Sequence, residues 1–195
     1  MDLVVKDLPF TAGSSNSHLD VWRRMIPHLS REVENWLRFG VFISPTWSVT
    51  PFHKQPRVNI PEEQHTFIGT QIEKDLTSGA IVPCHYPPTC SSRVFAVPKQ
   101  GAAKFRLVVD LRSVNESFPD LPARYDHLGK LADLAELGDW FFAIDLKQAY
   151  QQIAVHPTVS QYFGIQWNGQ FFKYTVLFSD GLAHRMCGLQ SCTRW

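Results

Sequence analysis

The sequence lacks a long apolar run. Its longest unbroken apolar stretch is Trp140–Ile144, whereas a spanning helix needs about 18 apolar residues or more, which excludes a transmembrane helix. The N-terminus carries Asp2, Lys6 and Asp7 around a short apolar pair, so it lacks the apolar core of a secretory signal peptide. We therefore expect an intracellular protein, cytoplasmic or nuclear, that has no membrane partner.

The sequence also has little net charge and few cysteines. Lys and Arg total 19 against 18 for Asp and Glu, a formal net charge of +1. This balance gives no global attraction to nucleic acid, so any basic patch must be local. The 4 cysteines, without a secretory signal, indicate reduced thiols.

Several common functional motifs are missing as well. The sequence contains no phosphate loop, no GxGxxG and no GxSxG, so it offers none of these signatures of nucleotide-binding proteins and hydrolases. The candidate zinc ligands are Cys84, His85 and Cys90, together with Cys187 and Cys192, but no CxxC pair occurs and the spacings are irregular. These spacings argue against a zinc site.

What the sequence does contain is enough apolar material for a core. Hydrophobic residues make up 44% and aromatic residues 13% of the chain, which is typical of a globular domain. Ser30 can cap a helix that ends before Gly40. A second helix follows Pro61, with an apolar residue at every fourth position, and ends at Gly79. By contrast, the composition of Thr11–Ser17 predicts a flexible loop or linker.

The remaining pattern predicts two hairpins, one more helix and one apolar strand. The first hairpin pairs residues 93–97 with 105–109, and a helix is expected over 127–137, before an apolar strand at Trp140–Leu146. The second hairpin turns at Asn168-Gly169, which favours a two-residue type I′ turn. This turn places a set of apolar side chains on one face. They are Phe163, Ile165, Trp167, Phe172 and Tyr174. A proline-rich loop is expected from Pro83 to Pro88, before the first hairpin.

Two constellations could carry chemistry. Asp145 ends the apolar strand, and a buried carboxylate there must be paired, cap the next helix or bind a metal. Around the first hairpin, five cations face one acid, Asp110, which leaves +4. The cations are Arg93, Lys99, Lys104, Arg106 and Arg112. Such a hairpin is either a clamp for phosphates or an ordinary solvated face.

Taken in order, these pieces resemble a reverse transcriptase domain, an RNA-directed DNA polymerase, of the retrotransposon type. The resemblance begins near Ile60 and ends near Leu177. It rests on five runs of residues, which are Leu76–Ile81, Val94–Lys99, Phe105–Asn115, Phe142–Tyr150 and Phe172–Leu177. It implies an α+β fold, made of the fingers and the first half of the palm of a right-hand polymerase.

The resemblance also implies roles for individual residues. Asp145 resembles the first catalytic aspartate, which in the family is a ligand of both Mg²⁺ ions. Lys99 and Arg106 resemble the pair that holds the incoming dNTP, and Tyr150 resembles the residue that excludes a ribose 2′-hydroxyl. Nucleic-acid contacts are then expected from the other cations of the hairpin, Arg93, Lys104 and Arg112, with an RNA or DNA template-primer as the partner. Other segments of a retroelement polyprotein are further expected partners.

The departures from the family concern the end of the chain. The family's Leu-Pro turn and its Tyr-x-Asp-Asp hairpin are absent, and Asp180 is the only acid after Asp145. We therefore expect an N-terminal extension over 1–59, a partial reverse-transcriptase-like unit over 60–177 and a divergent tail over 178–195. The expected function is that of a truncated nucleotidyltransferase domain, inactive alone. The alternatives are a non-catalytic nucleic-acid-binding fragment and a non-functional retroelement product.

Overall fold

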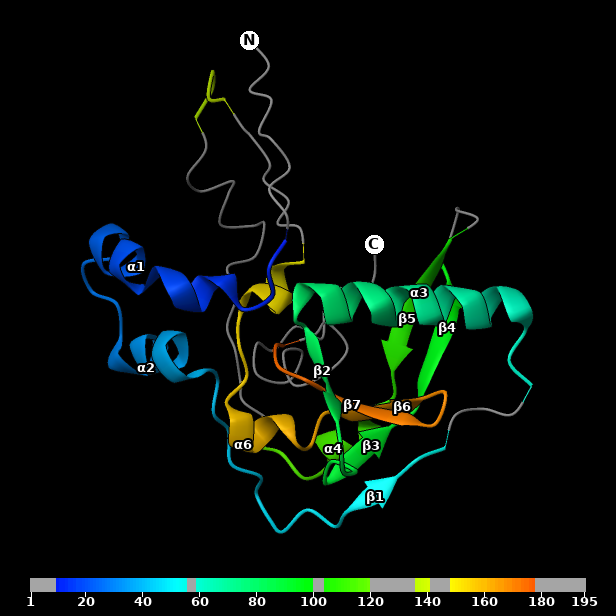
Figure 1. The fold of residues 1–195 in the computed structure, drawn as a ribbon. Helices are drawn as coiled ribbons and strands as arrows, with labels where there is room; N and C mark the ends of the chain where they lie inside the picture. Colours follow the sequence, from blue (N-terminus) through cyan, green and yellow to red (C-terminus); the bar gives the residue numbers. More distant parts are fainter. Residues whose placement is uncertain (1–9, 56–58, 100–103, 120–135, 141–147, 178–195) are drawn as a thin grey trace.

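The computed structural model describes residues 10–55, 59–99, 104–119, 136–140 and 148–177 (Figure 1). They form a mixed α+β fold, as the sequence predicts. The helices are η1 (Ser14–His18), α1 (Leu19–Met25), α2 (Arg31–Phe39), α3 (Glu62–Ser78), α4 (Arg112–Asn115), η2 (Ala149–Gln152) and α6 (Pro157–Ser160). The strands are β1 (Phe52–His53), β2 (Ile81–Cys84), β3 (Cys90–Ser92), β4 (Val94–Pro98), β5 (Phe105–Val109), β6 (Gly164–Trp167) and β7 (Gln170–Tyr174).

Some predicted features lie outside this description. The helix expected over 127–137 and the strand expected over Trp140–Leu146 lie almost entirely outside the described residues, and Asp145 and the tail over 178–195 lie outside them completely. Among the described helices, none is long and apolar enough to cross a membrane.

The two longer predicted helices are confirmed. The Ser30 hydroxyl accepts a hydrogen bond from the Val33 amide, so it caps α2 as expected. At the other end of α2, Gly40 has φ 83° and ψ 160°, a combination that is almost restricted to glycine. On α3, Ile68 and Ile72 are buried, and Gly79 ends the helix in a left-handed conformation.

Five strands form one sheet in the order β1-β3-β6-β7-β2. Strand β3 pairs in parallel with both β1 and β6, whereas β7 pairs antiparallel with β6 and β2. Gly164 opens β6 where a Cβ atom would lie 2.2 Å from Pro88 Cγ and 2.4 Å from the Cys90 carbonyl oxygen. Only glycine therefore allows β6 to approach β3 this closely.

The β6–β7 hairpin matches its prediction in turn, register and face. Asn168 and Gly169 both have positive φ, of 47° and 78°, which is the signature of a type I′ turn. Ile165 pairs with Phe172. All the side chains that the turn was expected to gather on one face are buried, at 5% exposure or less.

Two sequence predictions were wrong. Pro83 does not begin a loop but lies within β2, opposite Phe172, because β2 is at the edge of the described sheet, where a strand tolerates proline. Thr11–Ser17 is not a linker, since η1 forms from Ser14 onward and the Asn16 side chain bonds two other segments. Gly, Ser and Asn are common in linkers, but Ser and Asn side chains also stabilise turns through hydrogen bonds, as they do in this segment.

The β4–β5 hairpin is a separate two-stranded sheet that lies against α3 (Figure 1). Its strands, Val94–Pro98 and Phe105–Val109, agree with the predicted hairpin to within one residue. The Phe67 ring of α3 contacts the Phe105 ring of β5, with centroids 5.6 Å apart. Helix α3 thus connects this hairpin to the main sheet, and the space beside that connection is where the site lies.

Candidate functional site

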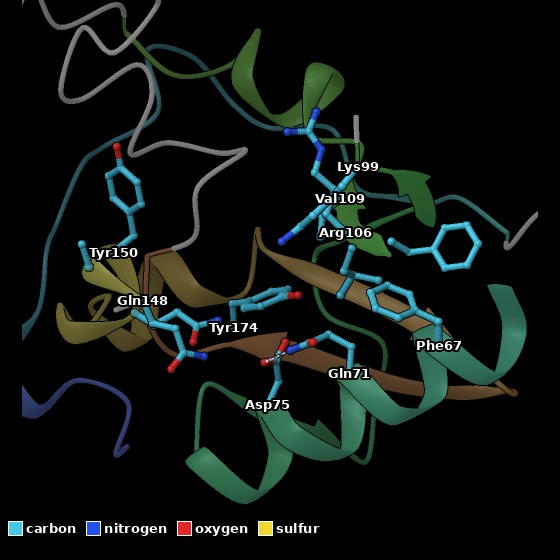
Figure 2. Close-up of a pocket in the computed structure, with 13 residues that line it drawn as sticks. Phe67, Gln71, Asp75, Lys99, Arg106, Val109, Gln148, Tyr150 and Tyr174 are labelled. Atoms are coloured by element: carbon cyan, nitrogen blue, oxygen red, sulfur yellow. Dashed lines mark hydrogen bonds between the residues drawn. The ribbon is translucent and has the colours of Figure 1, made fainter. Parts of the chain in front are cut away.

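A pocket of about 400 Å³ opens between α3, the β4–β5 hairpin and η2. Figure 2 shows Asp75 and Gln71 on α3 at one side of it, and Lys99 and Arg106 of the hairpin across from them. The pocket brings together Lys99, Arg106 and Tyr150, which the sequence analysis had named as nucleotide-binding residues. These three side chains come from two separate parts of the chain, the β4–β5 hairpin and η2.

The cationic side of the pocket belongs to the hairpin. Lys99 directly follows β4, and its amide donates a hydrogen bond of 2.8 Å to the Lys104 carbonyl oxygen. Arg106 lies on β5, opposite Val97. Both cationic side chains are exposed. They present a point charge and a planar fork of donors to whatever enters the pocket.

The acid in the pocket is Asp75, which sequence reasoning missed. Asp75 is only 3% exposed, and its carboxylate accepts a hydrogen bond of 2.9 Å from the Gln71 amide. Burial raises the pKa of Asp75, although the Gln71 and Gln151 side chains and Lys74 oppose this. A signal for it did exist, because Asp75 lies three residues after Ile72 and therefore on the apolar face of α3.

The third wall of the pocket is the single turn η2, which carries Tyr150. It begins after Gln148, a residue with φ 52° and ψ 41°, in a left-handed conformation that is uncommon outside glycine. Gln148 also lines the pocket.

The other predicted nucleic-acid contacts are not in the pocket. Arg93 donates through Nε to the Gln55 carbonyl oxygen at 3.1 Å. Lys104 is exposed and lies outside the pocket wall. Arg112 is paired with Asp110. None of these three side chains therefore lines the pocket with Lys99 and Arg106, and their contact with nucleic acid stays a prediction.

The ion pair of Arg112 is bidentate. Its Nε atom lies 2.8 Å from Oδ1 of Asp110, and its terminal nitrogen lies 2.9 Å from Oδ2. Lys54 Nζ adds a longer contact of 3.8 Å to Oδ2 and a hydrogen bond of 2.8 Å to the Ser113 hydroxyl. The Arg112 hydrogen bonds lower the pKa of Asp110 to about 2 against the opposing effect of burial. This arrangement holds the start of α4 to the end of β5.

A magnesium site is not formed by the residues that the structure describes. Among them, no group of three His, Cys, Asp or Glu side chains could hold a metal ion. Asp75 is the one acid that lines the pocket in the described part of the chain, and its carboxyl is buried and engaged by amides. The predicted ligand Asp145 lies outside the described residues.

Comparison with known proteins finds sequence relatives among retroviral Gag-Pol polyproteins. No family model matches the chain. The chain is 27% identical over 126 residues to the Gag-Pol polyprotein of Walleye dermal sarcoma virus, covering 64% of the chain and 7% of the polyprotein. It is 30% identical over 107 residues to the Gag-Pol polyprotein of Gibbon ape leukemia virus, covering 54% of the chain and 6% of the polyprotein.

Solved structures of foamy virus protease-reverse transcriptase share the fold. The complex with dsDNA has a TM-score of 0.56 at 21% identity and covers 72% of this chain and 28% of the other. The native Prototype Foamy Virus enzyme has a TM-score of 0.55 at 20% identity and covers 84% of this chain and 23% of the other. The chain has an incomplete reverse-transcriptase-like fold.

The expected fold class, a partial right-hand polymerase, is thereby confirmed. The relatives named are retroviral, so the reverse-transcriptase-like character is supported but the retrotransposon type is not. The chain spans well under a tenth of the length of the polyproteins that it matches.

Proposed function

We propose that this chain is a reverse-transcriptase-like domain whose pocket binds the triphosphate of a nucleotide. The observation that carries the proposal is the convergence of Lys99, Arg106 and Tyr150 on one pocket. A lysine and an arginine together suit a polyphosphate, because the guanidinium binds two oxygens at once while the ammonium adds a point charge. Tyr150, across the pocket, is then placed to contact the sugar.

Asp75 is compatible with an anionic ligand in this pocket. A fully charged carboxylate near a triphosphate would repel it. Burial, the largest effect, raises the pKa of Asp75 and favours the uncharged acid, whereas the hydrogen bond from the Gln71 side chain favours the carboxylate. The net rise in the pKa weakens the repulsion that Asp75 exerts on a bound phosphate.

The binding test uses calorimetric titration of the full chain with inorganic tripolyphosphate and with dATP. Lys99→Ala and Arg106→Ala should each weaken tripolyphosphate binding at least tenfold, since each removes a charge-assisted hydrogen bond of about 1.5–3 kcal/mol. The matched control is Lys104→Ala, on the same hairpin but outside the pocket wall, which should change the affinity less than threefold. Equal losses for all three variants would contradict a defined pocket.

We further propose that this chain by itself does not polymerise DNA. Two-metal phosphoryl transfer needs several carboxylates around a pair of ions, and Asp145 is followed in the sequence by one acid, Asp180. By the resemblance, Mg²⁺ would be bound at Asp145. The assay is primer extension on poly(rA)–oligo(dT), with no product expected. Extension that disappears in Asp145→Asn would overturn this proposal.

A second candidate function is nucleic-acid binding without chemistry. It is favoured by the exposed cations Lys99, Lys104 and Arg106 on one small hairpin, and the foamy virus neighbours include complexes with dsDNA and with an RNA/DNA hybrid. Binding should be weak, independent of sequence and steeply salt-dependent. Fluorescence polarisation with a labelled primer–template checks it, and the triple alanine variant of these cations should abolish it.

We also propose the kind of element from which this chain derives. The relatives matched are polyproteins, which supports other polyprotein segments as partners, and we propose a retrotransposon-type element as the source. A non-functional retroelement product is the remaining alternative. This alternative predicts that the protein binds neither nucleotide nor primer–template and that it melts without cooperativity.

A further inference from the structure

The N-terminal segment is hydrogen-bonded to two of the elements that line the pocket. Ala12–Asn16 lies outside the 60–177 run that carries the resemblance, yet it runs beside η2 (Figure 1). The Gly13 amide donates a hydrogen bond of 2.7 Å to the Gln151 carbonyl oxygen, and the Ala12 amide donates one of 3.0 Å to the Ser78 carbonyl oxygen at the end of α3. One short segment thus contacts two walls of the pocket.

The side chain of Asn16 connects three parts of the chain. Its Oδ1 accepts a hydrogen bond of 3.0 Å from the Ala154 amide, just beyond η2. Its Nδ2 donates a hydrogen bond of 3.0 Å to the Trp36 carbonyl oxygen in the last turn of α2. Close by, the Ser14 hydroxyl donates to the side-chain oxygen of Gln152. Residues 151–154 are therefore bonded to the N-terminal segment directly after Tyr150.

The opposite side of η2 is held by α3. The Gln151 side chain lies close enough to Asp75 to lower the pKa of that carboxyl, while its carbonyl oxygen accepts a hydrogen bond from the Gly13 amide. A four-residue 3₁₀ helix has little stability of its own, and the left-handed Gln148 before it persists only where its surroundings fix it. The place of Tyr150 in the pocket therefore depends on these external bonds as well as on its packing against the core.

We infer that Asn16 is a positioning residue for the nucleotide pocket, which fixes Tyr150 opposite Lys99 and Arg106 and so sets the discrimination between deoxyribonucleotides and ribonucleotides. This inference rests on the proposed function. The phosphates would be held by the hairpin, which Asn16 does not touch. The sugar would meet the turn that Asn16 restrains. Loss of Asn16 therefore acts on sugar selectivity and spares phosphate affinity.

The test uses the full chain with three variants. Asn16→Ala removes both hydrogen bonds, whereas Asn16→Asp keeps the acceptor for the Ala154 amide and loses the donor to Trp36. Asn35→Ala is the matched control, since Asn35 is an exposed asparagine on α2. Calorimetric titrations give the ratio of the dATP and ATP dissociation constants, and tripolyphosphate serves as the probe of the phosphate side alone.

We expect the wild type and Asn35→Ala to prefer dATP. In Asn16→Ala the preference should shrink about fivefold, because of the two hydrogen bonds that are lost only the one from the Ala154 amide lies next to η2. Tripolyphosphate affinity should stay unchanged within twofold. Asn16→Asp should recover part of the preference. An unchanged dATP-to-ATP ratio in Asn16→Ala, or an equal loss of tripolyphosphate affinity, overturns the inference.

Hydrogen–deuterium exchange separates this inference from the proposed function. In Asn16→Ala, the amides of residues 151–154 should exchange at least tenfold faster, while those of the β6–β7 hairpin keep their rate. Unchanged exchange at 151–154, or faster exchange throughout the protein, overturns the positioning role of Asn16. A wild type that binds neither nucleotide nor tripolyphosphate overturns the proposed function, and with it the selectivity, whatever the exchange shows.

Discussion

The pair formed by Asp110 and Arg112 should make the stability of this protein depend on acid pH in a defined way. The hydrogen bonds from Arg112 lower the pKa of Asp110 from 3.8 to about 2. A shift of one pKa unit corresponds to about 1.4 kcal/mol, so the full shift corresponds to roughly 2.5 kcal/mol. The Arg112 side chain is 86% exposed, and solvent screening reduces this to about 1–2 kcal/mol.

The sign follows from the lowered pKa. Because the folded carboxyl is the stronger acid, its stabilising effect is complete above the unfolded pKa and is lost as the pH falls toward the folded pKa. Asp110→Asn should therefore lower the free energy of unfolding by about 1–2 kcal/mol at pH 6. The gap to the wild type should narrow to about a third of that at pH 2.5.

Urea unfolding at pH 6 and at pH 2.5 measures this gap. Glu116→Gln is the control, because it removes an exposed carboxylate close to the same short helix. Its difference in free energy of unfolding from Asp110→Asn should equal that of the wild type. Arg112→Ala should reproduce the loss at pH 6, and the double variant should lose little more, because the two side chains act as one pair. A gap between the wild type and Asp110→Asn that stays constant from pH 6 to pH 2.5 would refute the reasoning.

Three further predictions concern the backbone. Gly40→Ala should lower the free energy of unfolding by about 3 kcal/mol or more, because glycine alone accepts this conformation and a Cβ would lie 2.7 Å from backbone atoms. Gly79→Ala has open space around the new Cβ and should lower it by only about 1 kcal/mol. Thermal unfolding compares the two variants. Gly164→Ala should separate β6 from β3, since its Cβ would lie 2.4 Å from the Cys90 carbonyl oxygen, and faster amide exchange in β3 would show it. Ser30→Ala should cost about 1 kcal/mol in the same unfolding assay through loss of the α2 cap.

Local signals predicted the parts of the fold that local chemistry determines. The Asn168-Gly169 turn fixed the register of β6 and β7, because both residues adopt positive φ at little cost. The cap at Ser30 fixed the start of α2 in the same way. These elements need no information from distant segments, which is why the sequence predicts their boundaries closely.

The short strands could not be predicted, because their partners are distant in the chain. β1 and β3 hold two and three residues, too few for an alternating pattern, and they pair in parallel. Ser91 and Ser92 of β3 are fully buried, although their residue type predicts exposure. Their burial follows from the pairing with β6, which the sequence around them does not reveal.

Some residues of the site could likewise be predicted from the sequence, and others could not. Lys99, Arg106 and Tyr150 were named from the resemblance, and the structure brings them to one pocket. Asp75 escaped notice because a charged residue on an apolar helix face is usually assigned to the edge of that face. The role of Asn16 was hidden by the composition of its segment, since a Gly-Ser-Asn run gives no sign of whether its side chains meet water or another part of the chain.

Helix α3 explains why these separate residues can share one site. Phe67 contacts Phe105 of the β4–β5 hairpin, Asp75 lines the pocket together with Gln151 of η2, and the Ser78 carbonyl oxygen accepts a hydrogen bond from the N-terminal segment. Phe67 and Asp75 lie eight residues apart on one rigid helix, which places them about 12 Å apart along its axis. The width of the pocket is thus set by helix geometry rather than by the loops at its rim. A substitution that loosens either attachment should therefore change the width of the pocket before it changes whether the chain folds.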